Sequence, residues 1–575
     1  MKPISDKKYK RQEKKSFFAK WRFFIVYGLI FIAVIGLVVH LVILQVFAPE
    51  KLIKEGDKRS IRHQEITMPR GTITDRSGRI LAVSIGMQDV WADPKIINQQ
   101  NGVDVNDTRW RALADGLAIP VTDLAKKLNG NSSRFVYLSR QITTEVADYI
   151  RHLKLPGIYF EPSSKRYYPA GEQLAQLVGF TDIDGNGAEG VERSFNSWLT
   201  GESGLRTIRR DRFGRVIEDI NSVAGEVAQD VVLSIDERLQ NLVFKELSLA
   251  VEFNKAVSGT AVLVDIKTGE VLAMATSPSY NPNNRTDFQR DLLRNRAVTD
   301  AFEPGSTVKP LVVMAALENN IVTPTTIIDT RPFYVNRFEV KDVSPQRELS
   351  IQGILQKSSN VGVSRLALQM DPAKVVEFYS RFGLGQPTNL GLGGETKGTI
   401  SANRKHWSDI ERATYAFGYG LMVTPLQLAR AYATIGSYGI YKPVSILRVD
   451  DPVKGTRVVQ ESIAKTVVQM MKTIAETGGG IRAAVPGYSV AIKTGTAKKV
   501  GSSGKYINEY IAYTGGIAPA TAPKYSLVVI IDNPKAGQYY GGSVSAPVFS
   551  RIMGGVLRTM NIEPDKPIEN SPVMN

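Results

Sequence analysis

The sequence predicts a membrane-anchored protein in which one N-terminal transmembrane helix is followed by two domains that combine α-helices and β-strands. Three observations support this fold class. An apolar run fills residues 23–46. The chain has 575 residues, which is too long for one ordinary domain. Helical and strand-like patterns both follow the apolar run, and a hydrophobic content of 43% is sufficient for sizeable cores.

The apolar run at 23–46 is long enough to cross a bilayer as a helix. Residues 1–22 carry nine Lys and Arg against two acidic residues, so we expect a cytoplasmic basic tail, with the rest of the chain outside the cytoplasmic membrane. A cleavable signal peptide that ends at Ala48 is the alternative. The run is longer than an ordinary signal core and Pro49 would follow the cut, so we favour an uncleaved anchor.

The composition excludes several classes of enzyme. The chain has no cysteine, hence no disulfide, thiolate nucleophile or sulfur-ligated metal. Its histidines lack the H-E-x-x-H spacing of zinc hydrolases, and no G-x-S-x-G sequence is present. We therefore expect no metal, no cofactor and no nucleic-acid partner. The net charge of +16 includes +7 from residues 1–22, which leaves a mildly basic remainder.

The segment after the anchor is predicted to be a structural module. Asp75-Arg76-Ser77-Gly78 has the composition of a turn between two strands, and residues 105–160 resemble a helical insertion. Segments 166–169, 187–192 and 211–215 are rich in glycine and charge but offer no nucleophile–base pair. We place this non-catalytic domain at residues 50–228.

A second domain is predicted at 229–562, followed by a flexible tail at 563–575. It begins with a short strand at 231–235, after which Asp236 is suited to cap a helix. Strands at 260–264 and 270–274 flank Lys267-Thr268-Gly269, which predicts a hairpin with glycine at its turn. The helix after Asp236 has apolar residues at helical spacing, namely Leu239, Leu242, Val243, Leu247 and Val251.

The first candidate catalytic motif is Ser306-Thr307-Val308-Lys309, which follows Gly305 and precedes the apolar run 310–317. The pattern predicts a buried helix with Ser306 in its first turn, where free N–H groups favour a developing anion. Lys309 lies one turn later on the same face, and burial there would favour its neutral, basic form. The alternative is an ordinary serine cap beside a lysine that reaches solvent.

The second motif, Ser358-Ser359-Asn360, lies 52 residues after Ser306. Ser358 is suited to pass a proton between Lys309 and a leaving amine, and Asn360 to orient substrate amides. A helix-to-loop turn is the structural alternative, because serine and asparagine are common in turns.

The third motif, Lys493-Thr494-Gly495, continues from an apolar strand into Thr496. Both threonine hydroxyls and the lysine charge suit a substrate carboxylate, and Gly495 would allow a ligand to approach the strand closely. The backbone N–H groups of Ser306 and Thr496 are candidates for an oxyanion hole.

Each motif alone is a weak signal, because this chain repeats all three. The repeats lack a glycine before a buried helix, or lie in polar loops or at a predicted turn, so we interpret them as structural. They are Ser5/Lys8, Ser462/Lys465, Ser502/Lys505, Ser279/Asn281, Ser401/Asn403 and Lys267-Thr268-Gly269.

The three motifs in this order match the S-x-x-K, S-x-N and K-T-G set of penicillin-binding proteins and serine β-lactamases. The chain resembles the class B penicillin-binding proteins, most closely the division-specific peptidoglycan D,D-transpeptidases of Gram-negative bacteria. The likeness covers nearly the whole chain, including the anchor and segments 70–78, 166–169, 187–192 and 302–306.

The resemblance implies an α+β pedestal domain of the dimerisation type. It also implies a penicillin-binding/transpeptidase α/β domain with a mainly antiparallel central sheet flanked by helices. Ser306 would attack the penultimate D-Ala of a stem pentapeptide, and an amine of an acceptor strand would resolve the acyl-enzyme. β-Lactams would acylate the same serine. A septal glycan polymerase and other division proteins are the implied partners.

Three alternatives remain: an elongation-type transpeptidase, a penicillin-hydrolysing enzyme, and a membrane-bound β-lactam sensor or scaffold without turnover. The long pedestal is unnecessary for a hydrolase. A sensor would need an output domain, which the short N-terminal tail does not provide.

Overall fold

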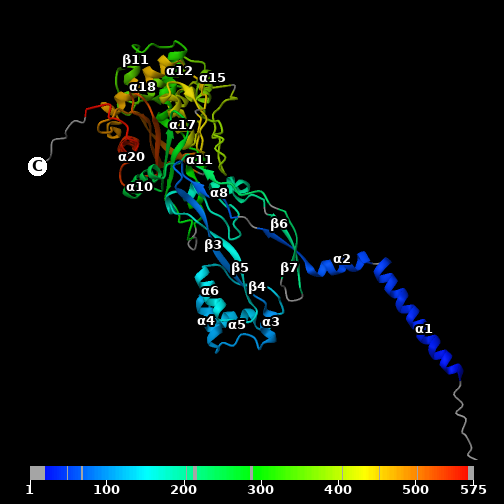
Figure 1. Ribbon diagram of the computed structural model, residues 1–575. Helices are drawn as coiled ribbons and strands as arrows, with labels where there is room; N and C mark the ends of the chain where they lie inside the picture. The colour runs from blue at the N-terminus through cyan, green and yellow to red at the C-terminus, as the bar shows by residue number, and fades with distance from the viewer. Residues whose placement is uncertain are drawn as a thin grey trace, which may run out of the picture. The chain divides into compact units, whose positions relative to one another are not determined.

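The computed structural model describes residues 20–567, apart from 48, 67–68, 203, 212–215, 224, 285–288, 405, 452 and 502 (Figure 1). Most of the predicted tails 1–22 and 563–575, and most of segment 211–215, lie outside the described residues. The chain divides into two compact units. One takes in Met1–Thr67 and Ser203–Glu226, and the other Met68–Glu202 and Val227–Asn575.

The first unit contains the predicted apolar helix. Helix α1 (Lys20–Val42) continues through a π-helical turn, η1 (Ile43–Phe47), and α2 (Pro49–Ser60) follows. Residues Trp21–Gln45 are long and apolar enough to cross a membrane, and none of this stretch is buried inside the protein. Strands β1 (Ile61–Ile66), β6 (Gly204–Arg210) and β7 (Val216–Val223) form an antiparallel sheet in this order.

The N-terminal part of the second unit is built on a sheet of order β4-β3-β2-β8, in which β5 also pairs with β3. The turn predicted at Asp75–Gly78 does connect β2 and β3. The helical insertion predicted at 105–160 is correct for three helices but misses β4, which pairs with one end of the long strand β3. The elements are β2 (Ile73–Thr74), β3 (Ile80–Ala92), α3 (Pro94–Gln99), α4 (Thr108–Gly116), α5 (Val121–Leu128), β4 (Val136–Ile142), α6 (Thr144–His152), β5 (Ile158–Tyr167) and β8 (Val231–Val232).

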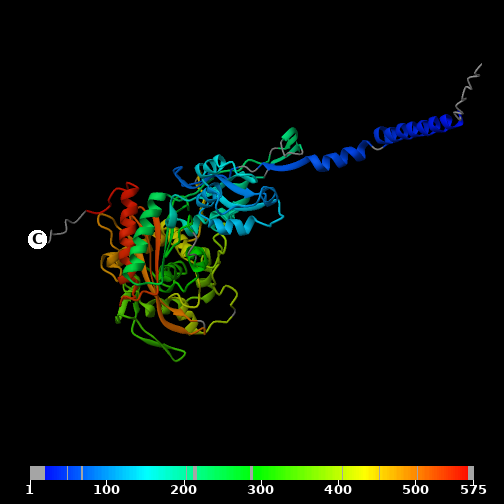
Figure 2. The ribbon, with the colours of Figure 1, turned by 90° about the horizontal axis from the view of Figure 1, so that it is seen from below.

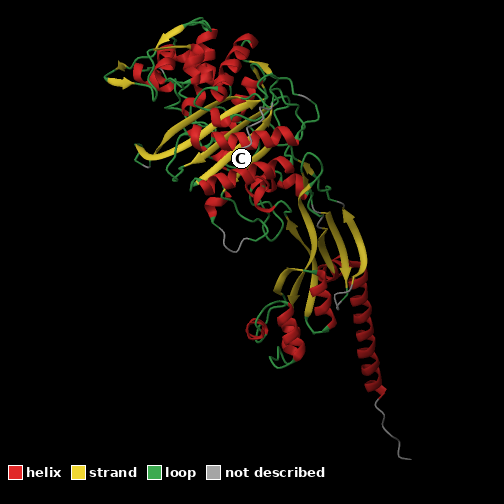
Figure 3. Ribbon diagram, turned by 90° about the vertical axis from the view of Figure 1, so that its left-hand side faces the viewer, coloured by secondary structure: helices red, strands yellow, loops and turns green. Residues whose placement is uncertain are grey.

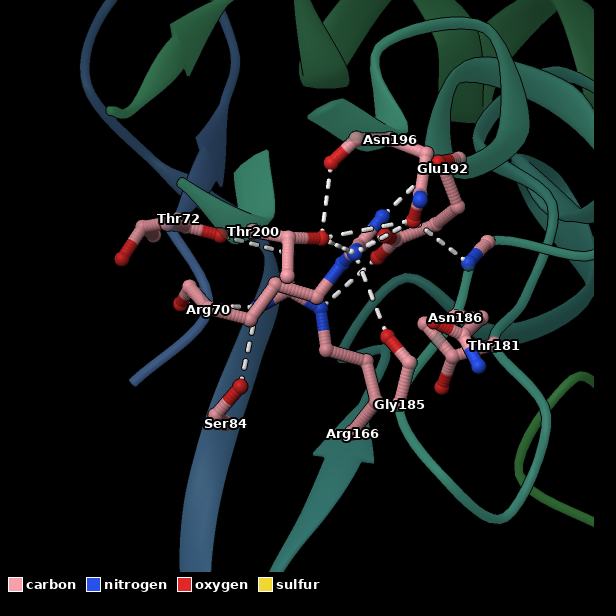
Figure 4. A network of polar contacts seen from close by, with 12 residues as sticks. Arg70, Thr72, Ser84, Arg166, Thr181, Gly185, Asn186, Glu192, Asn196 and Thr200 are labelled. Atoms are coloured by element: carbon pink, nitrogen blue, oxygen red, sulfur yellow. Dashed lines mark hydrogen bonds and ion pairs between the residues drawn. The ribbon is translucent and has the colours of Figure 1, made fainter. Parts of the chain in front are cut away.

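Two arginines share one buried carboxylate at the end of this sheet (Figure 4). Nε of Arg70 lies 2.6 Å from Oε2 of Glu192, and Nε of Arg166 lies 2.7 Å from Oε1 of Glu192. Arg70 also donates to the side chains of Asn196 and Thr200, both at 2.8 Å. The segments 70–78, 166–169 and 187–192 therefore meet in one network of polar contacts. The short helices around it are η2 (Gly171–Gln173), α7 (Ala175–Val178), α8 (Gly190–Ser194) and α9 (Asn196–Thr200).

The strand predicted at 231–235 as the start of the second domain is shorter than expected, and it pairs with β2 of the sheet described above. Strand β8 ends at Val232, because Leu233 forms a bridge with Leu447 and the Ser234 N–H donates to the Ile446 carbonyl. Asp236 caps α10 (Glu237–Phe253) by accepting the Arg238 N–H, as predicted.

The central sheet of this domain is antiparallel throughout, in the order β10-β9-β19-β18-β17 (Figure 3). Its strands are β9 (Ser258–Asp265), β10 (Val271–Ser277), β17 (Ala491–Val500), β18 (Tyr506–Ala518) and β19 (Tyr525–Asp532). The β9–β10 connection places Lys267 in the predicted turn. The sheet confirms the fold class, and β17 forms one of its edges.

Helices cover both faces of this sheet. Figure 2 shows α10 (green) and α20 (Ala546–Thr559, red) side by side on one face. Gly516 of β18 faces Phe549 of α20, whereas the preceding Gly515 faces Tyr432 of α17 (Pro425–Gly436). Because successive strand residues point to opposite faces, α17 lies on the other side.

The remaining helices and hairpins complete the domain. Helical elements are η3 (Arg290–Leu293), α11 (Arg296–Thr299), η4 (Gly305–Val308), α12 (Lys309–Glu318), α13 (Ile351–Gln356), α14 (Asn360–Leu368), α15 (Pro372–Arg381), α16 (Asp409–Tyr415), α18 (Glu461–Glu476), η5 (Ile481–Ala483) and α19 (Gly541–Val544). Short strands are β11 (Ile327–Asp329), β12 (Phe333–Val335), β13 (Phe338–Val340), β14 (Glu348–Ser350), β15 (Ile440–Tyr441) and β16 (Thr456–Arg457).

Candidate active site

Ser306 lies in the 3₁₀ turn η4, immediately before the buried helix α12. Gly305 adopts a φ of +52°, and a Cβ there would collide with the Tyr513 hydroxyl. Only glycine fits this position without strain, so it fixes the direction from which the chain reaches Ser306. Ser306 itself is partly exposed. The sequence placed it in the first α-helical turn, and the structure places it one tighter turn earlier.

Lys309 is fully buried, and its amine points to the second motif. Nζ of Lys309 lies 2.6 Å from the Ser358 carbonyl oxygen, 2.7 Å from Oδ1 of Asn360 and 3.2 Å from Oγ of Ser358. The Lys309 amine thus has three hydrogen-bond acceptors, and none of them is a carboxylate.

Ser358 connects α13 to α14 with a φ of +57°, a conformation that costs energy for a residue other than glycine. The following residue, Ser359, caps α14 by accepting the Gly362 N–H. The predicted helix-to-loop turn is therefore present, and it serves to orient the Ser358 side chain as well.

Lys493 reaches the same serine from strand β17. Its side chain is buried, and Nζ lies 2.9 Å from Oγ of Ser358 and 2.9 Å from the Thr494 carbonyl oxygen. Turn η4, which carries Ser306, packs against β17. Turn η4 and strand β17, which are nearly two hundred residues apart in the sequence, thus lie in contact. This contact is required if the three motifs form one site.

Burial controls the electrostatics of both amines. It lowers the pKa of Lys493 to about 7. The pKa of Lys309 falls well below its ordinary value, mainly because of burial and further because of the Lys493 charge, while Asp342 acts in the opposite direction. The site can therefore hold a neutral amine beside a serine hydroxyl near neutral pH, which is the requirement for a general base.

The remaining residues of the third motif line the same strand. Thr494 and Thr496 are partly exposed, and Oγ1 of Thr496 accepts the Gly541 N–H at 2.9 Å, which leaves its hydroxyl hydrogen available as a donor. The structure gives Gly495 a different role from the one predicted. A Cβ there would collide with the ring of Tyr513, so the missing side chain makes room for Tyr513 rather than for a ligand.

Sequence reasoning missed Asp342 and Gly541. The Asp342 carboxylate accepts hydrogen bonds from the start of α14, and Gly541 holds the Thr496 hydroxyl. Neither residue belongs to a motif, and all three contacts are made by backbone N–H groups, which leave no sequence pattern.

The other repeats of the motifs take different positions. Lys267 lies in the β9–β10 turn, and Ser462 lies in the first turn of α18. Ser401 and Asn403 occupy a loop and turn between α15 and α16. Ser5 and Ser502 lie outside the described residues.

Comparison with known proteins identifies the family of the chain. The sequence model of the "Penicillin binding protein transpeptidase domain" matches residues 259–554, and that of the "Penicillin-binding Protein dimerisation domain" matches residues 65–233. A peptidoglycan synthetase from Bifidobacterium adolescentis shares the fold with a TM-score of 0.71 at 27% identity. The alignment covers 88% of this chain and 98% of that one.

Relatives match almost from end to end. "Peptidoglycan D,D-transpeptidase FtsI" of Escherichia coli (strain K12) is 58% identical over 560 residues, which cover 97% of this chain and 95% of the relative. The FtsI protein of Buchnera aphidicola subsp. Schizaphis graminum is 50% identical over 96% of this chain and 97% of its own length. "Probable peptidoglycan D,D-transpeptidase PbpC" of Pseudomonas aeruginosa is 39% identical, covering 96% and 98%. The chain belongs to the class B penicillin-binding proteins, and it is a peptidoglycan D,D-transpeptidase of the serine acyl-transfer type.

Proposed function

We propose that this protein cross-links peptidoglycan stem peptides during septal wall synthesis, with Ser306 as the nucleophile. The observation that carries the proposal is the sharing of Oγ of Ser358 by the amines of Lys309 and Lys493. That arrangement connects the three motifs by hydrogen bonds through which a proton can pass.

In the acylation step, neutral Lys309 takes the proton of the Ser306 hydroxyl while its oxygen bonds to the penultimate D-Ala carbonyl carbon. The backbone N–H groups of Ser306 and Thr496 stabilise the oxyanion. The bond to the terminal D-Ala then breaks, and the leaving nitrogen receives a proton through Ser358. An amine of the acceptor strand attacks the ester, forms the cross-link and returns the proton to Ser306.

Residues next to Lys309 and Ser358 bind the substrate. Asn360 orients the amides of the stem pentapeptide, and Lys493 attracts its terminal carboxylate. Thr494 and Thr496 donate hydroxyl hydrogen bonds to that carboxylate, and Gly495 leaves room for the Tyr513 ring beside β17. β-Lactams acylate Ser306 because they present an equivalent amide and carboxylate.

The remaining parts of the chain place this reaction at the cell surface. Residues 23–46 anchor the protein in the cytoplasmic membrane with the tail 1–22 inside and the catalytic domain, 229–562, in the periplasm. The pedestal, 50–228, and the anchor meet a septal glycan polymerase and other division proteins.

Mass spectrometry of the full chain after exposure to penicillin tests the nucleophile. One adduct is expected on Ser306, with none in the variant Ser306→Ala and an undiminished one in Ser462→Ala, which alters the repeat on α18. Slow loss of the adduct excludes a penicillin hydrolase. An adduct on another serine would contradict the proposal.

Complementation and localisation test the cellular role. Wild type, but not Ser306→Ala, is expected to restore division in cells depleted of the protein, and the tagged chain is expected at mid-cell. Full restoration by Ser306→Ala would favour a scaffold. A signal along the side wall would favour the elongation-type alternative.

A further inference from the structure

Asp342 is a buried carboxylate next to the site that none of the three motifs contains. It follows strand β13, and all of its hydrogen-bond donors come from the start of α14. Oδ2 of Asp342 accepts the Ser359 hydroxyl at 2.5 Å, and Oδ1 accepts the N–H groups of Asn360 at 2.5 Å and Val361 at 2.9 Å. A negative group at this helix N-terminus also interacts favourably with the helix dipole.

The hairpin before Asp342 is packed against the same helix. Val335 of β12 and Val340 of β13 form a small core with Val361, the second residue of α14. The guanidinium of Arg365, one turn further along α14, lies over the Phe333 ring at 4.5 Å. The hairpin and α14 therefore hold Asp342 from two sides, so the carboxylate is fixed in position rather than free to rotate into solvent.

Asp342 makes hydrogen bonds with Asn360, whose side chain accepts from the Lys309 amine, and with Ser359, which lies between Ser358 and Asn360. Asp342 makes no hydrogen bond with the amine itself. Lys309 donates to Ser358 and to Oδ1 of Asn360, and Asp342 holds the Ser359 hydroxyl and the Asn360 N–H. The positive φ of Ser358 needs such restraint, since an unsupported residue would relax from this conformation.

We propose that Asp342 is a positioning residue for acyl transfer: its carboxylate fixes the start of α14, so that Ser358 and Asn360 receive the Lys309 amine. This inference rests on the proposed roles of Ser306, Lys309 and Ser358. Asp342 itself touches neither substrate nor reacting atoms.

The charge of Asp342 adds a measurable consequence. Among the described residues, the charged groups that act on Lys309 are Lys493 from β17, which lowers its pKa further, and Asp342, which raises it. Replacing the carboxylate by a neutral amide removes the opposing effect, so the pKa of Lys309 falls. Acylation needs the neutral amine of Lys309. The acid limb of the pH profile of the acylation rate is therefore expected to move to lower pH.

The test measures acylation of the full chain by fluorescent penicillin, in detergent, between pH 5 and pH 9. Asp342→Asn is expected to lower the acylation rate at pH 7 about tenfold, because hydrogen bonds to a charged acceptor are replaced by weaker ones. It is also expected to shift the acid limb to lower pH. The control is Asp329→Asn, which removes a carboxylate from neighbouring β11 that bonds Arg331 and pairs with Arg365 further along α14, but makes no hydrogen bond with the start of that helix. Its profile is expected to follow wild type.

The outcomes separate a positioning role from a merely structural one. An unshifted acid limb in Asp342→Asn, or an equal shift in Asp329→Asn, would overturn the inference even if the melting temperature falls. If Asp342→Asn fails to fold, the variant Asp342→Glu is used to test the positioning role. It keeps the charge but displaces the acceptor oxygens, so a slower rate with the wild-type acid limb is expected, and a wild-type rate would overturn the inference. Absence of an adduct on Ser306 in the wild type would instead refute the proposed function.

Discussion

Lys309 and Lys493 donate hydrogen bonds to one oxygen, Oγ of Ser358, at 3.2 and 2.9 Å. Two buried ammonium groups so close together would repel each other strongly, because the low-dielectric interior screens their charges poorly. The lowered pKa of both amines follows from this burial. Besides burial, the charge of Lys493 lowers the pKa of Lys309, so protonation of one amine disfavours protonation of the other.

The variant Lys309→Ala is expected to slow acylation of Ser306 by about 10²- to 10⁴-fold, the usual contribution of a general base. The change removes the only amine predicted to accept the serine proton. Stopped-flow measurement with a chromogenic cephalosporin gives the rate. Lys465→Ala is the matched control, because Lys465 forms the equivalent pair with Ser462 but bonds Glu461 on the surface of α18. Equal rates in the two variants would remove Lys309 from the mechanism.

The buried amine of Lys493 predicts a pH-dependent stability. Burial lowers its pKa from 10.5 to about 7. Between these values the unfolded chain binds a proton that the folded chain lacks, so stability rises with pH across this window and the gain is lost as pH falls toward 7. One such group contributes at most about 1.4 kcal/mol per pH unit.

Lys493→Met is expected to flatten this dependence, which melting temperatures of the full chain between pH 7 and pH 9.5 measure. Lys267→Met provides the control, since Lys267 belongs to the second Lys-Thr-Gly sequence and lies in an exposed turn. If the melting temperature of Lys493→Met rises with pH as steeply as that of wild type, the Lys493 amine stays protonated inside the site and the prediction is wrong.

Gly541→Ala is expected to weaken recognition of the substrate carboxylate. The added Cβ would collide with the Gly495 carbonyl oxygen, so α19 must move away from β17. The Thr496 hydroxyl then loses the N–H group that orients it. We expect about a tenfold lower acylation efficiency, expressed mainly as weaker binding of penicillin before acylation. Gly479→Ala, with nothing within 4 Å of its Cβ, is the control; an unchanged affinity in Gly541→Ala would contradict this role for α19.

The sequence was sufficient to select the three motifs that the structure brings together, because motif order and an apolar helix after Ser306 are local signals. It also predicted α10 with its Asp236 cap and the β9–β10 hairpin, which depend on short-range periodicity. Strand β4 was missed, because its pairing with β3 is a tertiary contact that overrides a weak local pattern.

The rest of the site could not be predicted for a related reason. Asp342 and Gly541 act on Asn360 and Thr496 across 18 and 45 residues, and backbone N–H groups carry each interaction. Gly495 illustrates the opposite case. The sequence marked it correctly as a place where no side chain fits, yet only the structure shows that Tyr513 occupies the space.

The network around Glu192 leads to a prediction about stability rather than chemistry. Glu192 is fully buried between Arg70 and Arg166, and each guanidinium makes a short ion pair with a different carboxylate oxygen. Glu192→Gln would leave two buried arginines without a counter-charge, a loss of about 3 kcal/mol or more in the free energy of unfolding.

Denaturant unfolding of the full chain measures this loss, with Asp148→Asn as the control because its ion pair with Arg151 lies on the surface. Exposed pairs contribute at most about 1 kcal/mol, so the control is expected to unfold almost like wild type. Acylation of Ser306 under strongly native conditions is expected to persist in Glu192→Gln, since the network shares no hydrogen bond with Lys309 or Lys493 in the described structure. A variant that unfolds normally but fails to acylate would show that the pedestal network acts on the catalytic residues, and not only on the fold that supports them.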